Sequence, residues 1–177
     1  MMRPRLVRRM STTVNRSWRA GILIGLAALL AAACTSEIEL VPENRPLTPE
    51  SLEWIEQLEA VEAQDRYEAA QALGEKGPEV ELAVPALITA LSKEEVAGVR
   101  WGIIWALGRI GPAAPGVLDT LVTALSDPDD HIRHEAARAL GTMGPSARPA
   151  LPAPDAASGD RNSAVEEAVR LAIESIG

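Results

Sequence analysis

The chain has 177 residues, which is enough for one domain of ordinary size with a substantial core. Its hydrophobic content of 47% excludes a disordered chain, and its single cysteine excludes a framework of disulfides. The net charge of −8 is unevenly divided, because residues 1–33 carry six arginines and no acid, and the remainder then carries a net charge of −14. So acidic a surface repels phosphate backbones, and we expect no nucleic-acid partner.

The N-terminal segment has the features of an export signal. Its six arginines precede an uncharged stretch, residues 20–33, which ends in three alanines. A basic region, a short apolar core and small residues before a cut site are typical of a secretory signal peptide, which we predict at residues 1–33. The alternative is a permanent transmembrane helix, but the stretch is shorter than the roughly 20 residues that such a helix needs.

The lone cysteine, Cys34, directly follows Ala31, Ala32 and Ala33. This arrangement resembles the lipobox of bacterial lipoproteins, in which small residues precede a cysteine that is lipidated and becomes the new N-terminus. The resemblance implies a lipid such as palmitate on Cys34 and anchoring in the cell envelope, and Thr35 in place of aspartate favours the outer membrane. Two features leave ordinary signal peptidase cleavage open: Ala31 stands where the lipobox usually has leucine, and the three alanines also fit that enzyme.

Residues 34–50 hold three prolines among polar side chains, and we expect a flexible tether there, followed by a capping helix at residues 51–64. The segment from Glu37 to Glu68 carries ten acids and two arginines. The ordinary interpretation is a solvated tether and helix face. The functional alternatives are that it holds the domain away from lipid headgroups or recruits a basic partner.

From residue 65 onward the chain repeats one pattern at intervals of 33 or 34 residues. Each repeat has an aliphatic anchor at the same place: Leu73, Leu107, Leu140 and Ile173. Apolar residues recur every three or four positions, which predicts an amphipathic first helix. The Gly-Pro pair that follows predicts the end of this helix. A second helix follows at residues 84–92 and again at 118–126. Because such a pair cannot bury its own apolar face, the pairs must stack.

The first helices read RYEAAQALGEKGP from Arg66, RWGIIWALGRIGP from Arg100, RHEAARALGTMGP from Arg133 and EEAVRLAIESIG from Glu166. These segments resemble HEAT-like repeats, specifically the short type first described in phycobilisome lyases. The resemblance implies an all-α fold, an α-solenoid of about three and a half helix-pair repeats over residues 65–177. It also implies a non-enzymatic scaffold or adaptor that binds a protein and needs no cofactor. The alternatives are a bilin-lyase-like chromophore-attachment protein and a soluble periplasmic binding module.

Departures from the repeat pattern predict where the stack changes. Pro152 and Pro154 fall in the second helix of the third repeat, which we therefore expect to be short, frayed or replaced by a loop. Asp65 and Lys76 occupy apolar positions of the first repeat, and we expect them to face solvent or the cap. Glu166 stands where the other repeats have arginine, which predicts a weaker stack towards the C-terminus.

One aromatic column is the candidate binding site. Tyr67, Trp101 and His134 occupy equivalent positions in three repeats, and Trp105 lies one turn beyond Trp101 on a face that the apolar stripe does not use. Exposed Trp and Tyr are favoured anchors of protein interfaces, so we predict that these four residues form a partner-binding patch. The alternative is that neighbouring helices or the tether cover the two indoles.

The remaining polar residues point to architecture. In the related HEAT-like repeats such arginines pair with acids and keep the stack in register. The resemblance therefore implies the same role for Arg66, Arg100 and Arg133, with Asp127, Asp129 and Asp130 as the nearby candidates; the alternative is a ligand-binding arginine row. His131 and His134 lie three residues apart but lack a third ligand, so no metal site is expected. The sequence offers no nucleophile motif and no phosphate-binding loop.

Overall fold

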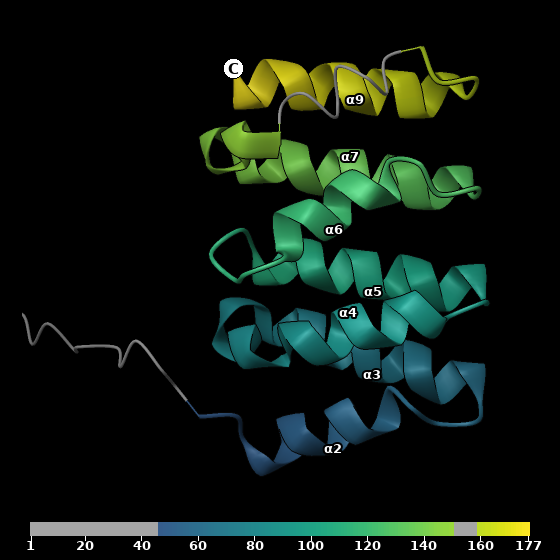
Figure 1. Ribbon diagram of the computed structural model, residues 1–177, viewed down its shortest axis with the longest axis vertical. Helices are drawn as coiled ribbons and strands as arrows, with labels where there is room; N and C mark the ends of the chain where they lie inside the picture. Colours follow the sequence, from purple (N-terminus) through teal and green to yellow (C-terminus); the bar gives the residue numbers. More distant parts are fainter. Residues whose placement is uncertain (1–45, 151–158) are drawn as a thin grey trace, which may run out of the picture. The chain divides into compact units, whose positions relative to one another are not determined.

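The computed structural model describes residues 46–150 and 159–177, and within these ranges its regular structure is helical throughout (Figure 1). The first helices of the repeats lie side by side in one layer: α3 (Ala63–Lys76), α5 (Ala97–Ile110), α7 (Asp130–Met143) and α9 (Ser163–Ile176). A second layer packs against them: the 3₁₀ helix η1 (Gly77–Ala83), α4 (Val84–Lys93), α6 (Val117–Ala124) and the 3₁₀ helix η2 (Gly144–Ala150). The short helix α2 (Pro49–Gln57) packs against α3. The all-α solenoid is therefore confirmed.

Several sequence-based predictions concern residues outside the described ranges. They are the signal peptide at residues 1–33, lipidation at Cys34, most of the tether and the proline-containing element at residues 151–158. Among the residues that the structure does describe, no helix is both long enough and apolar enough to cross a membrane.

Glycine and an aspartate set the ends of the first helices. Gly77, Gly111 and Gly144 follow α3, α5 and α7 with φ values of 59°, 98° and 52°, a region that side chains with a Cβ avoid. At the other end of α7, the carboxylate of Asp129 accepts a hydrogen bond from the backbone N–H of His131 at 2.9 Å. The predicted ends of the first helices at Gly-Pro pairs are thus confirmed, and an aspartate caps the start of α7.

The predicted anchors lie in one aliphatic core. Leu73, Leu107 and Leu140 are fully buried, and Ile173 packs against them while half-buried. Burial of each leucine stabilises the fold by about 2 kcal/mol. The second layer contributes further buried leucines: Leu87, Leu121 and Leu125.

Neighbouring first helices approach to backbone contact at a recurring glycine. A Cβ on Gly74 would lie 2.8 Å from the Cα of Ala106, and one on Gly141 would lie 3.2 Å from the Cα of Ala172. Both distances are shorter than the 3.5–4.0 Å at which carbon atoms pack well. The glycine of the repeated Leu-Gly dipeptide therefore sets the spacing of the stack.

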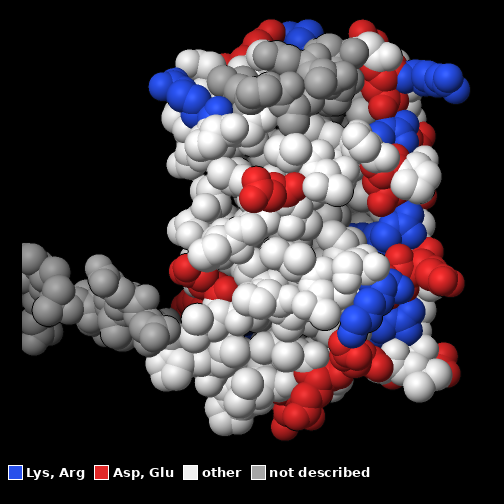
Figure 2. Space-filling model, viewed as in Figure 1, with Lys and Arg blue, Asp and Glu red and all other residues white. Residues whose placement is uncertain are grey.

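Charged side chains gather along one edge of the molecule, on the right in Figure 2, where the loops before the first helices lie. The face formed by α4 and α6 is largely uncharged in the same view, since α4 carries only Lys93 and α6 only Asp119. Asp65 and Lys76 are exposed, as their departure from the apolar pattern predicts.

Candidate functional site

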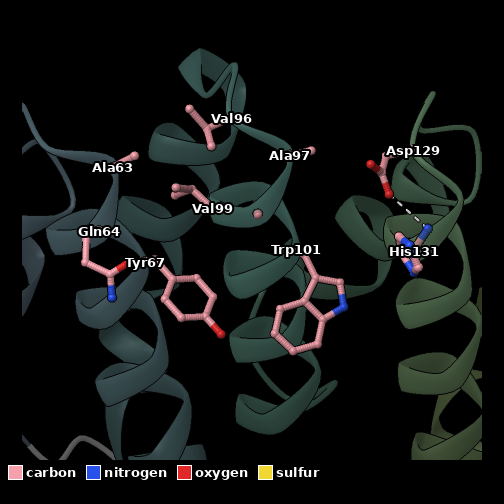
Figure 3. Close-up of a pocket in the computed structure, with 10 residues that line it drawn as sticks. Ala63, Gln64, Tyr67, Val96, Ala97, Val99, Trp101, Asp129 and His131 are labelled. Atoms are coloured by element: carbon pink, nitrogen blue, oxygen red, sulfur yellow. Dashed lines mark hydrogen bonds between the residues drawn. The ribbon is translucent and has the colours of Figure 1, made fainter.

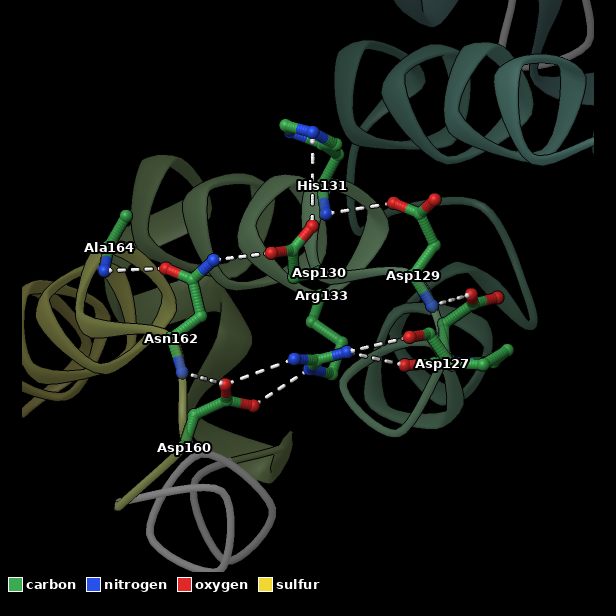
Figure 4. Close-up of polar contacts among 9 residues, drawn as sticks. Asp127, Asp129, Asp130, His131, Arg133, Asp160, Asn162 and Ala164 are labelled. Carbon is green, nitrogen blue, oxygen red and sulfur yellow. Dashed lines mark hydrogen bonds and ion pairs between the residues drawn. The ribbon is translucent and has the colours of Figure 1, made fainter.

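Three arginines on the charged edge join successive repeats. Arg133 donates through Nε and Nη2 to the carboxylate of Asp160, at 2.7 and 3.0 Å (Figure 4). Its Nη1 donates to the carbonyl oxygens of Asp127 and Pro128, at 2.9 and 3.2 Å. The guanidinium thus ties the loop before α7 to the acid that precedes α9. The same bidentate pairing recurs in two earlier pairs, Arg66–Glu94 and Arg100–Asp127.

These contacts stabilise the charged forms of the three arginines and of two of the acids, Asp160 and Glu94. The hydrogen bond from Arg133 holds the pKa of Asp160 below its ordinary value, and the hydrogen bond from Arg66 does the same for the pKa of Glu94. The carboxylates in turn raise the pKa of each arginine. All three guanidinium groups therefore make their hydrogen bonds within the fold, and their predicted architectural role is confirmed.

The choice of acids needs correction. Of the three candidates, only Asp127 receives an arginine side chain. Asp129 caps α7, and Asp130 accepts a hydrogen bond from the side-chain amide of Asn162. The acids that were missed, Glu94 and Asp160, follow their arginines by 28 and 27 residues. This spacing, which differs by only one residue between the pairs, is a signal in the sequence that could have found them.

Next to this edge, Tyr67 of α3 and Trp101 of α5 line a groove (Figure 3). Their rings stack with centroids 6.4 Å apart and an interplanar angle of 25°. The Tyr67 ring lies against Gly102, where a Cβ would be 2.9 Å from the ring, so the missing side chain makes room for the tyrosine. Both aromatic side chains are half-buried.

We call this space the aromatic groove; its volume is about 630 Å³. Beyond the two rings, its lining is mainly aliphatic, and the polar residues Gln64, Asp129 and His131 complete it. Gln64, Gly98 and His131 are equivalent positions of successive repeats, near the starts of α3, α5 and α7. A Cβ on Gly98 would have no neighbour within 4 Å, so a glycine at this position leaves the groove open.

Trp105 occupies a different environment from Trp101. Its ring lies over Gly74 in the contact between α3 and α5, where a Cβ on the glycine would be 2.5 Å from the indole. The guanidinium of Arg109 lies 5.7 Å from the centre of the same ring. Trp105 is half-buried and packs against the core, which makes it a support for the helix contact that lies beside the groove.

His134 lies at a second groove, between α7 and α9, with a volume of about 490 Å³. The structure therefore brings Tyr67 and Trp101 together but places His134 apart from them, and His131 takes the position beside the aromatic groove. His131 Nε2 lies 3.8 Å from a carboxylate oxygen of Asp130. Within the described ranges, no three histidine, cysteine or acidic side chains cluster in a way that could hold a metal ion.

Stacked helix pairs around a continuous core define the class of protein as an α-solenoid. Residues 51–140 match the family model of HEAT repeats, and residues 132–153 match that of the PBS lyase HEAT-like repeat. The chain belongs to the HEAT-repeat family. Proteins of this class are generally protein-interaction scaffolds, and the fold is typically non-enzymatic.

Similarity to individual proteins adds information on the fold alone. The chain resembles an engineered protein whose crystal structure was solved by the Northeast Structural Genomics Consortium, with 23% identity and a TM-score of 0.52. The match covers 70% of this chain and 60% of the engineered protein. No curated protein sequence matches the chain.

Proposed function

We propose that this chain is a lipid-anchored protein of the bacterial cell envelope whose HEAT-repeat solenoid docks a protein partner, as a scaffold or adaptor without enzymatic activity. The observation that carries the proposal is the stacked pair Tyr67 and Trp101, which lies half-buried at an apolar groove. Large aromatic side chains in partly formed pockets are the usual anchors of protein interfaces.

The four residues of the candidate patch have different roles in this proposal. Tyr67 and Trp101 contact the partner directly, because both line the groove. Trp105 supports them from the contact between α3 and α5. His134 lies at the second groove along the same layer of first helices, where an extended partner would reach it.

A pull-down from crosslinked cell envelopes tests the docking site. The tagged chain captures a partner, and Trp101→Ala reduces the capture by about tenfold, which corresponds to the loss of one hot-spot side chain. Leu82→Ala is the matched control, because Leu82 is a large apolar residue that is 50% exposed and lies outside the groove. Equal capture by both variants would exclude the groove as the docking site.

The lipid anchor is supported by the sequence Ala-Ala-Ala-Cys at residues 31–34, which follows an apolar stretch. The variant Cys34→Ser tests it in cells that are supplied with labelled palmitate. We expect the wild-type chain to incorporate the label and to be cleaved, and the variant to stay unlabelled as a precursor. Unchanged cleavage of the variant would show ordinary secretion without a lipid.

A further inference from the structure

We infer that the segment that docks in the aromatic groove is cationic, with lysine or arginine residues on both sides of a large apolar side chain. This inference rests on the proposed function and specifies the chemistry of the partner. It combines an apolar floor, an acidic rim and the pairing of the neighbouring Arg66 and Arg100 with other acids.

The apolar residues that line the groove, which we call its floor, favour an apolar side chain of the partner. Ala63, Val96, Ala97 and Val99 line the groove together with Tyr67 and Trp101. Its volume of about 630 Å³ lies within the range of pockets that enclose a bound group. The two rings would also attract a guanidinium group of the partner, because the face of an aromatic ring carries negative charge.

The rim is acidic. Glu62 and Asp65 flank the groove residues Ala63 and Gln64, and Glu95 precedes Val96. All three acids are exposed, and the described part of the chain places none of them in an ion pair. Asp129 adds a fourth carboxylate at the far side of the groove, where its hydrogen bond is to a backbone N–H (Figure 3).

The nearest arginines, Arg66 and Arg100, are already paired with other acids, although each also attracts one rim acid, Glu62 or Asp129. Arg66 and Arg100 follow the rim acids in sequence, but each is held bidentately by Glu94 or Asp127. Each of these pairs is neutral as a unit, so the four rim acids and the two pairs together carry a net negative charge. The N-terminal ends of α3, α5 and α7 contribute only roughly half a positive charge each.

This distribution favours one class of partner. An acidic segment would bring like charges together at the rim, which disfavours its binding. A basic segment would be attracted to the rim acids, because charges of opposite sign steer a partner to its site. An uncharged apolar segment would contact the apolar lining of the groove but would gain nothing from the rim acids. A segment with an apolar anchor between basic residues would contact the apolar lining and pair with the rim acids as well.

Fluorescence anisotropy with the full chain in a non-ionic detergent tests the inference. The probe is the labelled peptide Lys-Arg-Leu-Trp-Leu-Arg-Lys. Two matched peptides replace either all basic residues by glutamate or all apolar residues by serine. We expect the basic apolar peptide to bind at least about tenfold more tightly than either, and its affinity to fall as salt rises.

Variants separate the contributions of floor and rim. Trp101→Ala weakens binding of the basic apolar peptide by about tenfold. Asp65→Asn and Glu95→Gln each weaken it by about threefold and reduce its salt dependence, since each removes one rim charge. Leu82→Ala leaves binding unchanged, and circular dichroism checks that every variant keeps its helix content.

Three results would overturn the inference. If the glutamate peptide binds as tightly as the basic one and Trp101→Ala abolishes both, the groove docks partners but their charge is misassigned. If Trp101→Ala changes the binding of no peptide, the docking site itself is wrong. If the serine peptide binds as well as the apolar one, attraction is electrostatic only and the groove has no part in it.

Discussion

The substitution Gly74→Ala tests how the repeats are held together, because it adds one methyl group at the closest approach between α3 and α5. The new Cβ would lie 2.8 Å from the Cα of Ala106 and 2.5 Å from the indole of Trp105. Carbon atoms pack well at 3.5–4.0 Å, so the two helices must separate by roughly 0.7 Å or more. The methyl group meets backbone, which cannot rotate away.

The magnitude follows from two opposing terms. Alanine favours a helix over glycine by about 1 kcal/mol, and overpacking of a tight contact costs about 1–3 kcal/mol. At Gly74 both a backbone atom and a ring block the new methyl group, so we expect the upper part of the range to apply. The net loss in the free energy of unfolding is then about 1–2 kcal/mol.

Urea unfolding followed by circular dichroism measures this loss. Gly98→Ala on α5 is the control, because a Cβ there would have no neighbour within 4 Å. We expect that variant to be more stable than the wild-type chain by about 0.5 kcal/mol. A Gly74→Ala variant that equals or exceeds the wild type in stability would refute the close approach of α3 and α5.

Three further predictions concern other contacts. Arg133 lowers the pKa of Asp160, so their pair stabilises the fold above the ordinary aspartate pKa, and this contribution is lost as the pH falls through the lowered value. We therefore expect Arg133→Gln to lower the free energy of unfolding at neutral pH and to make it fall less steeply in acid. Urea unfolding across a pH series measures this, and wild-type and variant stabilities that run parallel across the pH range would contradict it. Trp105→Ala should cost about 2 kcal/mol, less than a fully buried tryptophan, while the variant still binds the basic apolar peptide below its unfolding transition. Loss of binding with unchanged stability would reverse the role assigned to this ring. Asn162 caps α9 through the backbone N–H of Ala164 at 2.9 Å, and Asn162→Ala should cost about 1 kcal/mol in thermal unfolding, with faster hydrogen exchange confined to α9; unchanged exchange there would exclude the cap.

The sequence predicts the solenoid well because the signals of a repeat are local and recur. The spacing of Leu73, Leu107 and Leu140 places one buried residue at the same point of each first helix, and the structure buries all three. The Gly-Pro pairs mark the ends of these helices for the same reason. The partners of the arginines were harder to predict, because each pair crosses from one repeat to the next.

The candidate site was only partly predictable. Alignment of the repeats places Tyr67 and Trp101 at equivalent positions, and the structure stacks their rings. The alignment does not indicate that Gly98 leaves a groove beside these two rings, or that Trp105 lies over Gly74. Both features depend on how closely α3 and α5 approach, a distance that a single helix pattern does not contain.

Photocrosslinking in the producing cells tests most directly whether a protein partner docks in the aromatic groove. A photoreactive amino acid replaces Gln64, which borders the groove, or Thr89, which is exposed on α4. We predict a protein adduct from position 64 that disappears when Trp101→Ala is added, and none from position 89. An adduct from position 89 that persists with Trp101→Ala, with none from position 64, would contradict the account.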